Sequence, residues 1–278
     1  MPELPEAETI ARDLRRHVVG RTVTGVKVTH ADVLGSGLTA KSLSDRVVGR
    51  HIGDVGRRGK NVVIRFRAGS RIGPILVVNL GMTGRLVVSE APKASELRHV
   101  AVRFELDHGG AILYDDIRRF GRLDLYTPKE WLARQRELGI EPFSDALTAE
   151  RLHEMTQRSR TPIRNWLLDQ RRIAGIGNIY ANEALFRAGI RPTRPANTLS
   201  RADAERLRKG IRDVLGEAIK VRGTTLRDYR DASGEAGGFE PLLRVYGREG
   251  KPCPVCGTPI ERVVISNRSA FYCPNCQK

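Results

Sequence analysis

Cysteine is scarce in this chain and is confined to one end of it. The first 252 residues contain none, and the last 26 of the 278 residues contain all four: Cys253, Cys256, Cys273 and Cys276. A disulfide-stabilised secreted protein spreads its cysteines along the chain, so this distribution argues against that class and favours a reducing cytoplasm. Long apolar runs are also lacking, since stretches such as residues 75–78 are far too short to cross a bilayer.

The first residues, MPELPEAETIARDL, lack the features of a secretory leader. They are acidic and contain two prolines, whereas a leader has basic residues followed by an apolar stretch. We therefore expect no secretory signal. A polar, proline-bearing start is usually a frayed terminus, which makes the role of these residues a question for the rest of the sequence.

Acidic residues are few relative to basic ones. Lys and Arg total 48 and Asp and Glu total 32, which gives a formal charge of +16 and a pI near 10.3. A protein this basic usually has a polyanionic partner, and nucleic acid is the first candidate. A membrane surface is the second, but no helix is strongly basic on one face and aromatic-apolar on the other. Charge alone does not separate an enzyme from a structural nucleic-acid-binding protein.

The sequence contains two kinds of hydrophobic periodicity. Residues 7–19 predict an amphipathic helix. Residues 21–126 alternate with a period of two in short β-branched runs, and the Gly109-Gly110 pair indicates a hairpin. This part predicts an antiparallel sandwich or barrel.

From about residue 130 the period returns to 3.6, which predicts a helical second half. Expected helices are residues 147–157, a helix opened by Thr161-Pro162 through Arg171, residues 179–187 capped by Asn178, and a helix opened by Ser200. Residues 223–240 are polar and glycine-rich, so they read as a flexible loop.

The most specific local signal is the cysteine spacing. Cys253 and Cys256 form one C-x2-C pair, and Cys273 and Cys276 form another after sixteen residues. This spacing matches a tetrahedral four-thiolate zinc site, and a metal with four protein ligands is structural rather than catalytic. Two disulfides or unliganded thiols are the alternative. Alternation between the pairs indicates a hairpin with residues 267–269 near its tip, where Arg268 suits a phosphate or is a solvated charge.

Three further stretches have residue types that suit DNA. The glycine-rich turn at 174–178 leads into a helix and suits an anion, or is a simple helix connection. The stretch 115–121 places two arginines and Phe120 after a strand, which suits insertion into a base stack, and Met82 lies in another such loop. Core packing and a solvated charge pair are the alternatives there, and for Met82 alone core packing is the better interpretation. Lys60 follows a basic turn and is one of nine lysines against 39 arginines.

Together these pieces resemble one family along essentially the whole chain, the bacterial formamidopyrimidine-DNA glycosylases. The motifs, in the family's order, are PELPE, the GKN turn, LGMTG, RRFG, AGIGNIYANEALF, TTLRDYRDASGEAGGF, VYGREG and YCPNCQ. The resemblance implies an α+β multidomain fold. Its expected parts are an N-terminal helix plus antiparallel β-sandwich (2–130), a helix–two-turn–helix domain (131–240) with a lesion-recognition loop (223–240), and a C-terminal β-hairpin zinc finger (241–278).

The resemblance also implies a catalytic role for the first residues. Met1 would be removed, and the amine of Pro2 would attack the sugar C1′, displace an oxidised purine and form a Schiff base. Glu3 would act as general acid and base, Lys60 would contact DNA near the lesion, and β,δ-elimination would then cut the strand. A retained Met1 would leave the Pro2 nitrogen as an amide that cannot attack.

Other roles follow from the resemblance position by position. DNA contacts fall on His99, Arg118, Arg164, Asn178 and Arg268; intercalation on Met82, Arg118 and Phe120; and lesion contacts on Glu6, Glu183, Thr224, Thr225 and Tyr229. One structural Zn²⁺ would be bound by the four cysteines. The expected partner is duplex DNA with oxidised purines or abasic sites, with no membrane partner, for a monomer in the cytoplasm. Ile117, where many members have proline, and Arg164, where lysine is common, depart from the pattern.

Two other functions remain open. Endonuclease VIII, which removes oxidised pyrimidines, shares the Pro-Glu start and the architecture, but LPE, RRFG and the long 223–240 loop favour the purine enzyme. A non-catalytic zinc protein that only binds DNA is the other alternative. Intact Pro2, Glu3 and Lys60 argue against it.

Overall fold

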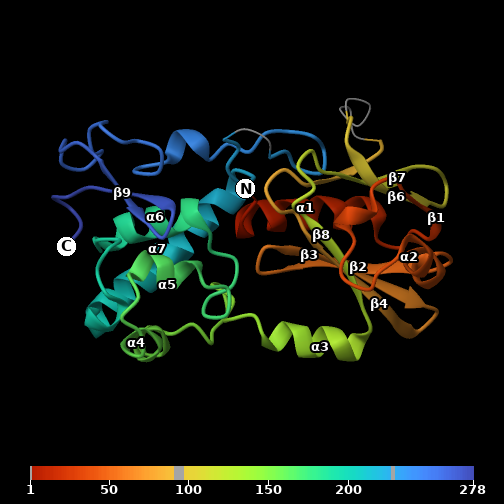
Figure 1. Cartoon of the computed structure of the whole chain (residues 1–278), viewed down its shortest axis with the longest axis horizontal. Coiled ribbons are helices and arrows are strands. Elements are labelled where there is room, and N and C mark those ends of the chain that lie inside the picture. The colour runs from red at the N-terminus through yellow and green to blue at the C-terminus, as the bar shows by residue number, and fades with distance from the viewer. Residues whose placement is uncertain (1, 91–96, 227–228) are drawn as a thin grey trace. The chain divides into compact units, whose positions relative to one another are not determined.

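The computed structural model describes residues 2–90, 97–226 and 229–278 and divides the chain into two compact units (Figure 1). The N-terminal unit comprises the chain up to Arg136 together with residues 221–238, and the second unit comprises 137–220 and 239–278. We call residues 221–238 the returning segment. The sequence analysis assigned most of it to the middle domain, whereas the structure groups it with the N-terminal unit.

Two four-stranded antiparallel sheets form the frame of the N-terminal unit, with strand orders β1-β6-β7-β5 and β2-β3-β4-β8. Its described elements are α1 (Leu4–Val18), β1 (Val23–Val28), η1 (Ala31–Val33), α2 (Ala40–Val47), β2 (His51–Arg58), β3 (Asn61–Ala68), β4 (Arg71–Asn79), β5 (Arg85–Val88), β6 (Val100–Leu106), β7 (Ala111–Asp115), β8 (Arg122–Tyr126) and α3 (Pro128–Arg136). The predicted antiparallel sandwich is confirmed, and Gly109-Gly110 lies in the turn between β6 and β7 as expected.

Helix α1 packs its apolar face into the core between the sheets. Ile10 and Leu14 are fully buried in one cluster with side chains of both sheets, and the helix contacts β2, β3 and β5 (Figure 1). The helix begins at Leu4, three residues earlier than predicted. A proline is tolerated in a first turn, and Glu3 and Glu6 form a capping box there.

The sheet β2-β3-β4-β8 is also covered on its other face. Trp131 of α3 is buried against Val63, Ile75 and Val77 on the side of this sheet away from the main core. Burial on both faces explains why β3 and β4 have nearly continuous apolar runs. Helix α2 was not predicted, because it has only eight residues and a capping box made by Thr39 and Ser42 rather than by a glutamate.

The second unit consists mainly of helices and ends in a β-hairpin. Its described elements are α4 (Ala149–Gln157), α5 (Ile163–Leu168), α6 (Asn178–Ala188), η3 (Ala196–Thr198), α7 (Arg201–Lys220), η4 (Glu240–Leu242), β9 (Glu261–Ile265) and β10 (Arg268–Tyr272). Helix α6 is buried on nearly all sides and contacts α5, α7 and β10. Helix α5 ends before the predicted Arg171, whose backbone N–H donates to the Asp169 carboxylate at 3.1 Å.

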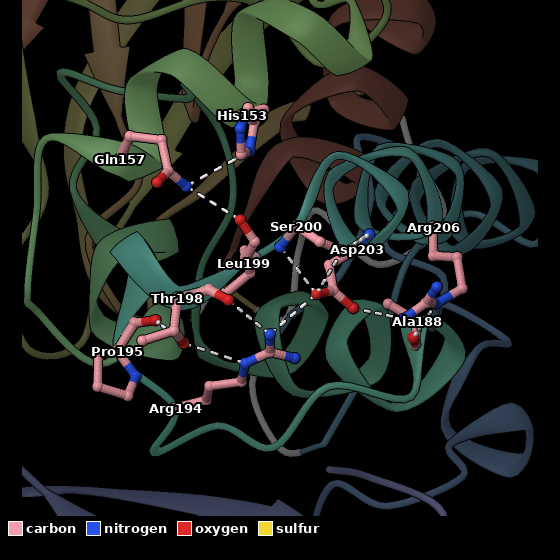
Figure 2. Close-up of polar contacts among 10 residues, drawn as sticks. All are labelled: His153, Gln157, Ala188, Arg194, Pro195, Thr198, Leu199, Ser200, Asp203 and Arg206. Atoms are coloured by element: carbon pink, nitrogen blue, oxygen red, sulfur yellow. Dashed lines mark hydrogen bonds and ion pairs between the residues drawn. The ribbon is translucent and has the colours of Figure 1, made fainter.

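A buried carboxylate, Asp203, fixes the start of α7 (Figure 2). The backbone N–H and hydroxyl of Ser200 each donate to Asp203 Oδ2 at 2.9 Å, and the Asp203 N–H donates back to Ser200 Oγ at 3.1 Å. Arg206 pairs with Asp203 and donates from Nε to the carbonyl of Ala188 at 3.1 Å. The predicted opening of this helix at Ser200 is confirmed, and the same cluster joins the end of α6 to α7.

The helices of the described part of the chain were also compared with the thickness of a bilayer. None of them has both the length and the apolar character needed to cross one.

Candidate functional site

The first residues of the chain are held in place rather than frayed. Pro2 is buried, and Glu3 and Glu6 are each 1% exposed. The Glu3 N–H donates to Glu6 Oε2 at 2.7 Å, and the Glu6 N–H donates to the Glu3 carboxylate in return. Met1 lies outside the described residues, so its removal stays a prediction.

The second oxygen of Glu6 binds the returning segment. The backbone N–H of Thr224 donates to Glu6 Oε1 at 2.7 Å. Gly223 has a φ of +86°, and a Cβ at this position would lie 2.8 Å from the same oxygen. Only glycine therefore allows the segment to approach this closely. The structure thus brings together Glu3, Glu6 and Thr224, three of the predicted site residues.

Thr225 and Tyr229 support the returning segment from within. The Thr225 hydroxyl donates to the Tyr229 carbonyl at 3.0 Å and accepts from the Gly237 N–H at 2.9 Å. The Tyr229 ring lies in the core, and burial raises the pKa of its hydroxyl well above the ordinary value. Their predicted contacts to a lesion stay predictions, and residues 227–228 of this segment lie outside the described residues.

Lys60 lies on a tight hairpin turn that is joined to α1. Gly59, with a φ of +59°, and Lys60 connect β2 to β3, and Lys60 is half-buried. Arg57 donates from Nη1 to the Gly59 carbonyl at 2.9 Å and from Nε to Glu8 at 2.9 Å. Burial raises the pKa of Glu8, but hydrogen bonds from Arg57 and Arg12 outweigh this and leave the pKa below its ordinary value.

The three residues predicted to intercalate lie together. The Arg118 guanidinium donates to the Met82 sulfur at 3.3 Å and lies 4.5 Å from the centre of the Phe120 ring. Met82 is 39% and Phe120 is 61% exposed, which is unusual for large apolar side chains. The two loops therefore present one apolar and cationic tip.

A residue that the sequence analysis did not single out, Asp116, holds this tip in place. Its buried carboxylate accepts from the Thr83 hydroxyl at 2.5 Å, the Tyr114 hydroxyl at 3.0 Å and the Gly121 N–H at 2.8 Å. The available signal was an aspartate directly after the apolar run AILY. Gly81 completes the contact between the loops, because a Cβ there would lie 2.5 Å from the Gly121 nitrogen.

His99 lies beside the base of the same tip. Its backbone N–H donates to Asp115 Oδ1 at 2.8 Å, and its carbonyl accepts from the Asp116 N–H at 3.1 Å. The side chain is exposed, as a DNA contact requires. Its predicted contact to DNA stays a prediction.

In the second unit, α5 and α6 support the hairpin that carries Arg268. Asn178 donates from Nδ2 to the Ser269 carbonyl at 3.0 Å, and Arg164 donates from Nη2 to the same carbonyl at 2.9 Å. Arg164 also donates from Nη1 to the Ile265 carbonyl at 3.3 Å. Arg268 is exposed at the start of β10, next to the turn at the hairpin tip.

Two predictions in this region need correction. Arg164 has no exposed surface, which does not agree with a phosphate contact, because its guanidinium donors are directed at hairpin carbonyls. Desolvation, and then repulsion from Arg268, lowers the pKa of Arg164 to about 10. Asn178 does not cap α6 either: Gly177 is the cap residue, and the Asn178 amide bonds the hairpin instead.

Glu183 is also placed differently from the prediction. Its carboxylate is fully buried and accepts from the backbone N–H groups of Arg244, Val245 and Tyr246 at 3.1, 3.0 and 2.9 Å. Burial raises its pKa. This geometry supports a structural role in the chain that leads to the cysteines, and it does not suit contact with a lesion.

The four cysteines form a metal site. Their sulfur atoms all lie within 4.8 Å of one another, and the Cys253–Cys276 and Cys256–Cys273 pairs are 3.9 and 3.5 Å apart. Four thiolates around one Zn²⁺ are spaced by about 3.8 Å, whereas a disulfide requires about 2.05 Å. The donor set and spacing fit one structural zinc ion.

Known family models match three parts of the chain. Residues 1–123 match the formamidopyrimidine-DNA glycosylase N-terminal domain, and residues 138–230 match the formamidopyrimidine-DNA glycosylase H2TH domain. Residues 250–278 match the zinc finger found in FPG and IleRS. The last match covers all four cysteines.

Relatives and solved structures match along the whole length. Formamidopyrimidine-DNA glycosylases of Desulforamulus reducens and Pelotomaculum thermopropionicum are each 43% identical, covering 100% of this chain and 99% of theirs. The MutM (Fpg) protein of Thermus thermophilus has a TM-score of 0.85 at 39% identity, covering 99% of this chain and 98% of that one. Lactococcus lactis Fpg in complex with abasic-site DNA has a TM-score of 0.88 at 29% identity, covering 99% of each chain.

Sequence, fold and metal site therefore lead to the same assignment. The chain belongs to the formamidopyrimidine-DNA glycosylase family, bifunctional DNA-repair enzymes that release oxidised purines and cleave the strand at the abasic site.

Proposed function

We propose that the amine of Pro2, exposed when Met1 is removed, is the nucleophile of this enzyme. The observation that carries the proposal is the capping box of Glu3 and Glu6, which holds the start of α1 firmly and buries both carboxylates. A nucleophile must be held in one place to react efficiently. An N-terminal amine has a pKa of about 8, so a useful fraction is unprotonated near neutral pH.

The reaction that these residues support proceeds in balanced steps. The Pro2 nitrogen forms a bond to C1′ as the bond from C1′ to the base breaks, and the base leaves with a proton. The sugar ring then opens as O4′ takes a proton from Glu3, which leaves a cationic iminium. Loss of a C2′ proton expels the 3′ phosphate, a second elimination expels the 5′ phosphate, and water releases the enzyme.

The exposed tip of Met82, Arg118 and Phe120 suits the conformational step before chemistry. C1′ is inaccessible while the damaged base is stacked, so the nucleotide must leave the helix. Apolar wedges beside an arginine are a common way to fill the resulting gap. Lys60, His99 and Arg268 would bind the DNA backbone, each from its own loop or hairpin.

We propose duplex DNA with an oxidised purine or an abasic site as the substrate. Lactococcus lactis Fpg has been crystallised with abasic-site DNA and with Fapy-dG DNA, both at 29% identity to this chain. The same protein has also been crystallised with DNA containing an oxidised pyrimidine. Oxidised pyrimidines are therefore a second candidate substrate. We place the reaction in the cytoplasm, where cysteine thiols stay reduced and available to zinc.

Borohydride trapping tests the proposal directly. Duplexes carrying 8-oxoguanine opposite cytosine, an oxidised pyrimidine, an abasic site or no lesion are incubated with the protein, and adducts are located by mass spectrometry. We expect an adduct at Pro2 with 8-oxoguanine and abasic DNA, and loss of base excision in Glu3→Gln. The matched control, Lys41→Gln, breaks an exposed ion pair on α2 and should react normally.

Three outcomes would contradict the proposal. An adduct on another residue would exclude Pro2 as the nucleophile. Trapping with pyrimidine lesions and abasic DNA only would assign the other substrate class. Binding without any adduct would leave a DNA-binding protein that does not carry out this chemistry.

A further inference from the structure

Helix α1 has a polar stripe beside its apolar face. Glu6, Thr9 and Asp13 are three and four residues apart, so they lie on one side of the helix. They are 1%, 4% and 4% exposed, which is rare for polar residues on a helix. The stripe continues from Glu3, at the start of the same helix.

Each residue of this stripe contacts the returning segment. Glu6 accepts the Thr224 N–H, and a hydrogen bond joins the side chains of Thr9 and Tyr229. The third contact is an ion pair between Asp13 and Arg222. The segment is therefore attached to α1 at three successive levels along the helix.

The third contact is part of a cluster of two carboxylates and one guanidinium. Arg222 donates from Nε to Asp231 Oδ2 at 2.7 Å, and its Nη2 atom pairs with both Asp231 and Asp13. The other oxygen of Asp231 accepts the N–H groups of Ser233 and Glu235, each at 2.9 Å. The side chains of Asp13 and Asp231 are only 6% and 1% exposed. We call Asp13, Arg222 and Asp231 the Arg222 cluster.

The backbone at Arg222 indicates that its side chain matters. Its φ is +66°, a left-handed conformation that costs a non-glycine residue about 1 kcal/mol. Glycine would adopt this conformation without that cost. The ion pairs with two buried carboxylates offset the strain, because losing the guanidinium would leave both charges buried and unpaired.

We propose that the Arg222 cluster positions the returning segment for base recognition and is specific to the excision step. The proposal rests on the proposed function, in which α1 carries Pro2 and Glu3 at its start. Through Asp13, Arg222 sets the place of the segment along α1, and through Asp231 it holds the turn at residues 231–235. An abasic site has no base to recognise, so cleavage at such a site does not need this placement.

The test compares two activities of one protein. Arg222→Gly keeps the left-handed backbone and removes the guanidinium, so it isolates the side chain. Single-turnover excision of 8-oxoguanine should fall about tenfold or more, while cleavage at a preformed abasic site should stay within about twofold of wild type. Arg222→Lys, which retains a cation between the carboxylates, should recover part of the excision rate.

Arg16→Gln is the matched control. Arg16 also pairs with Asp13, at 3.9 Å, but its side chain is 72% exposed and α1 alone holds the pair. This variant should leave both activities unchanged. If Arg222→Gly does not fold, Asp13→Asn gives the second test, because it weakens the same attachment and leaves Asp231 paired.

The outcomes separate this inference from the proposed function. Equal loss of both activities in Arg222→Gly, or no loss of either, would overturn the positioning role while wild-type trapping at Pro2 stands. Failure of the wild-type protein to form an adduct would overturn the proposed function itself. Slower hydrogen exchange at Ser233 and Glu235 in wild type than in Arg222→Gly would further support the positioning role.

Discussion

At the scale of single residues, two buried carboxylates orient the groups proposed to meet DNA. Asp116 receives hydrogen bonds from two hydroxyls and a backbone N–H, and it supports the loop of Arg118 and Phe120. Glu6 joins the backbone of Glu3 to that of Thr224. Neither carboxylate has a reacting role in the proposed mechanism, yet each fixes the geometry of residues that do.

The substitution Asp116→Asn should disturb the exposed tip. An amide NH₂ would face donors in place of one carboxylate oxygen, which costs about 1–3 kcal/mol for each buried group left unsatisfied. We expect a lower free energy of unfolding in urea and slower excision of 8-oxoguanine. Asp124→Asn, which affects an exposed ion pair with Arg122, is the control and should change stability by about 0.5 kcal/mol or less. Unchanged excision by Asp116→Asn would show that the tip does not depend on this carboxylate.

Glu8 predicts a pH dependence of stability. Its folded-state pKa is lowered, so its contribution is fully present above the unfolded-state pKa and is lost as pH falls through the folded value. The difference in unfolding free energy between wild type and Glu8→Gln should be about 1 kcal/mol near neutral pH and should shrink below about pH 4.5. Urea denaturation from pH 3 to 7 measures it. A difference that grows in acid would have the wrong sign for this pair.

At the scale of elements, local patterns were predictable and distant partners were not. The apolar face of α1, the hairpin at Gly109-Gly110 and the cap at Ser200 depend on residues a few positions apart. The roles of Arg164 and Glu183 depend on partners 101 and 61 residues away, which no local pattern shows. The polar stripe of α1 was missed for the same reason, since Arg222 is 209 residues from Asp13.

The zinc-finger hairpin allows the support of Arg268 to be separated from its contact with DNA. Arg268→Ala should weaken DNA binding and reduce the slope of log K against log salt concentration by about one, without changing thermal stability. Arg164→Met should lower stability, because it leaves hairpin carbonyls without donors. Fluorescence anisotropy at several salt concentrations and thermal unfolding measure the two effects. A reduced salt slope in Arg164→Met at unchanged stability would instead support a direct phosphate contact.

At the scale of the whole molecule, metal and charge connect the parts of the chain to one substrate. The four thiolates lie close enough to repel one another without a cation, and a net charge of +16 favours a polyanion. The metal site lies in the second unit and the proposed nucleophile in the N-terminal unit. Loss of the metal should therefore separate DNA binding from the integrity of the N-terminal fold.

Removal of zinc should unfold the C-terminal hairpin selectively. A strong chelator should release one Zn²⁺ per chain and raise hydrogen exchange in β9 and β10, because zinc binding supplies much of the folding free energy of such a site. Exchange in the sheets of the N-terminal unit should stay unchanged, while DNA affinity falls. Full DNA affinity in the metal-free protein would contradict a structural role for the site.

The grouping of residues 221–238 with the N-terminal unit has a consequence for how the protein is made. The ribosome completes this segment only after it has added the 84 residues from Glu137 to Lys220. Until then, Glu6, Thr9 and Asp13 lack their partners. A nascent or truncated chain ending at Arg136 thus has its proposed nucleophile in place before the segment that recognises a damaged base. Synthesis order delays completion of the enzyme until most of its DNA-binding parts exist.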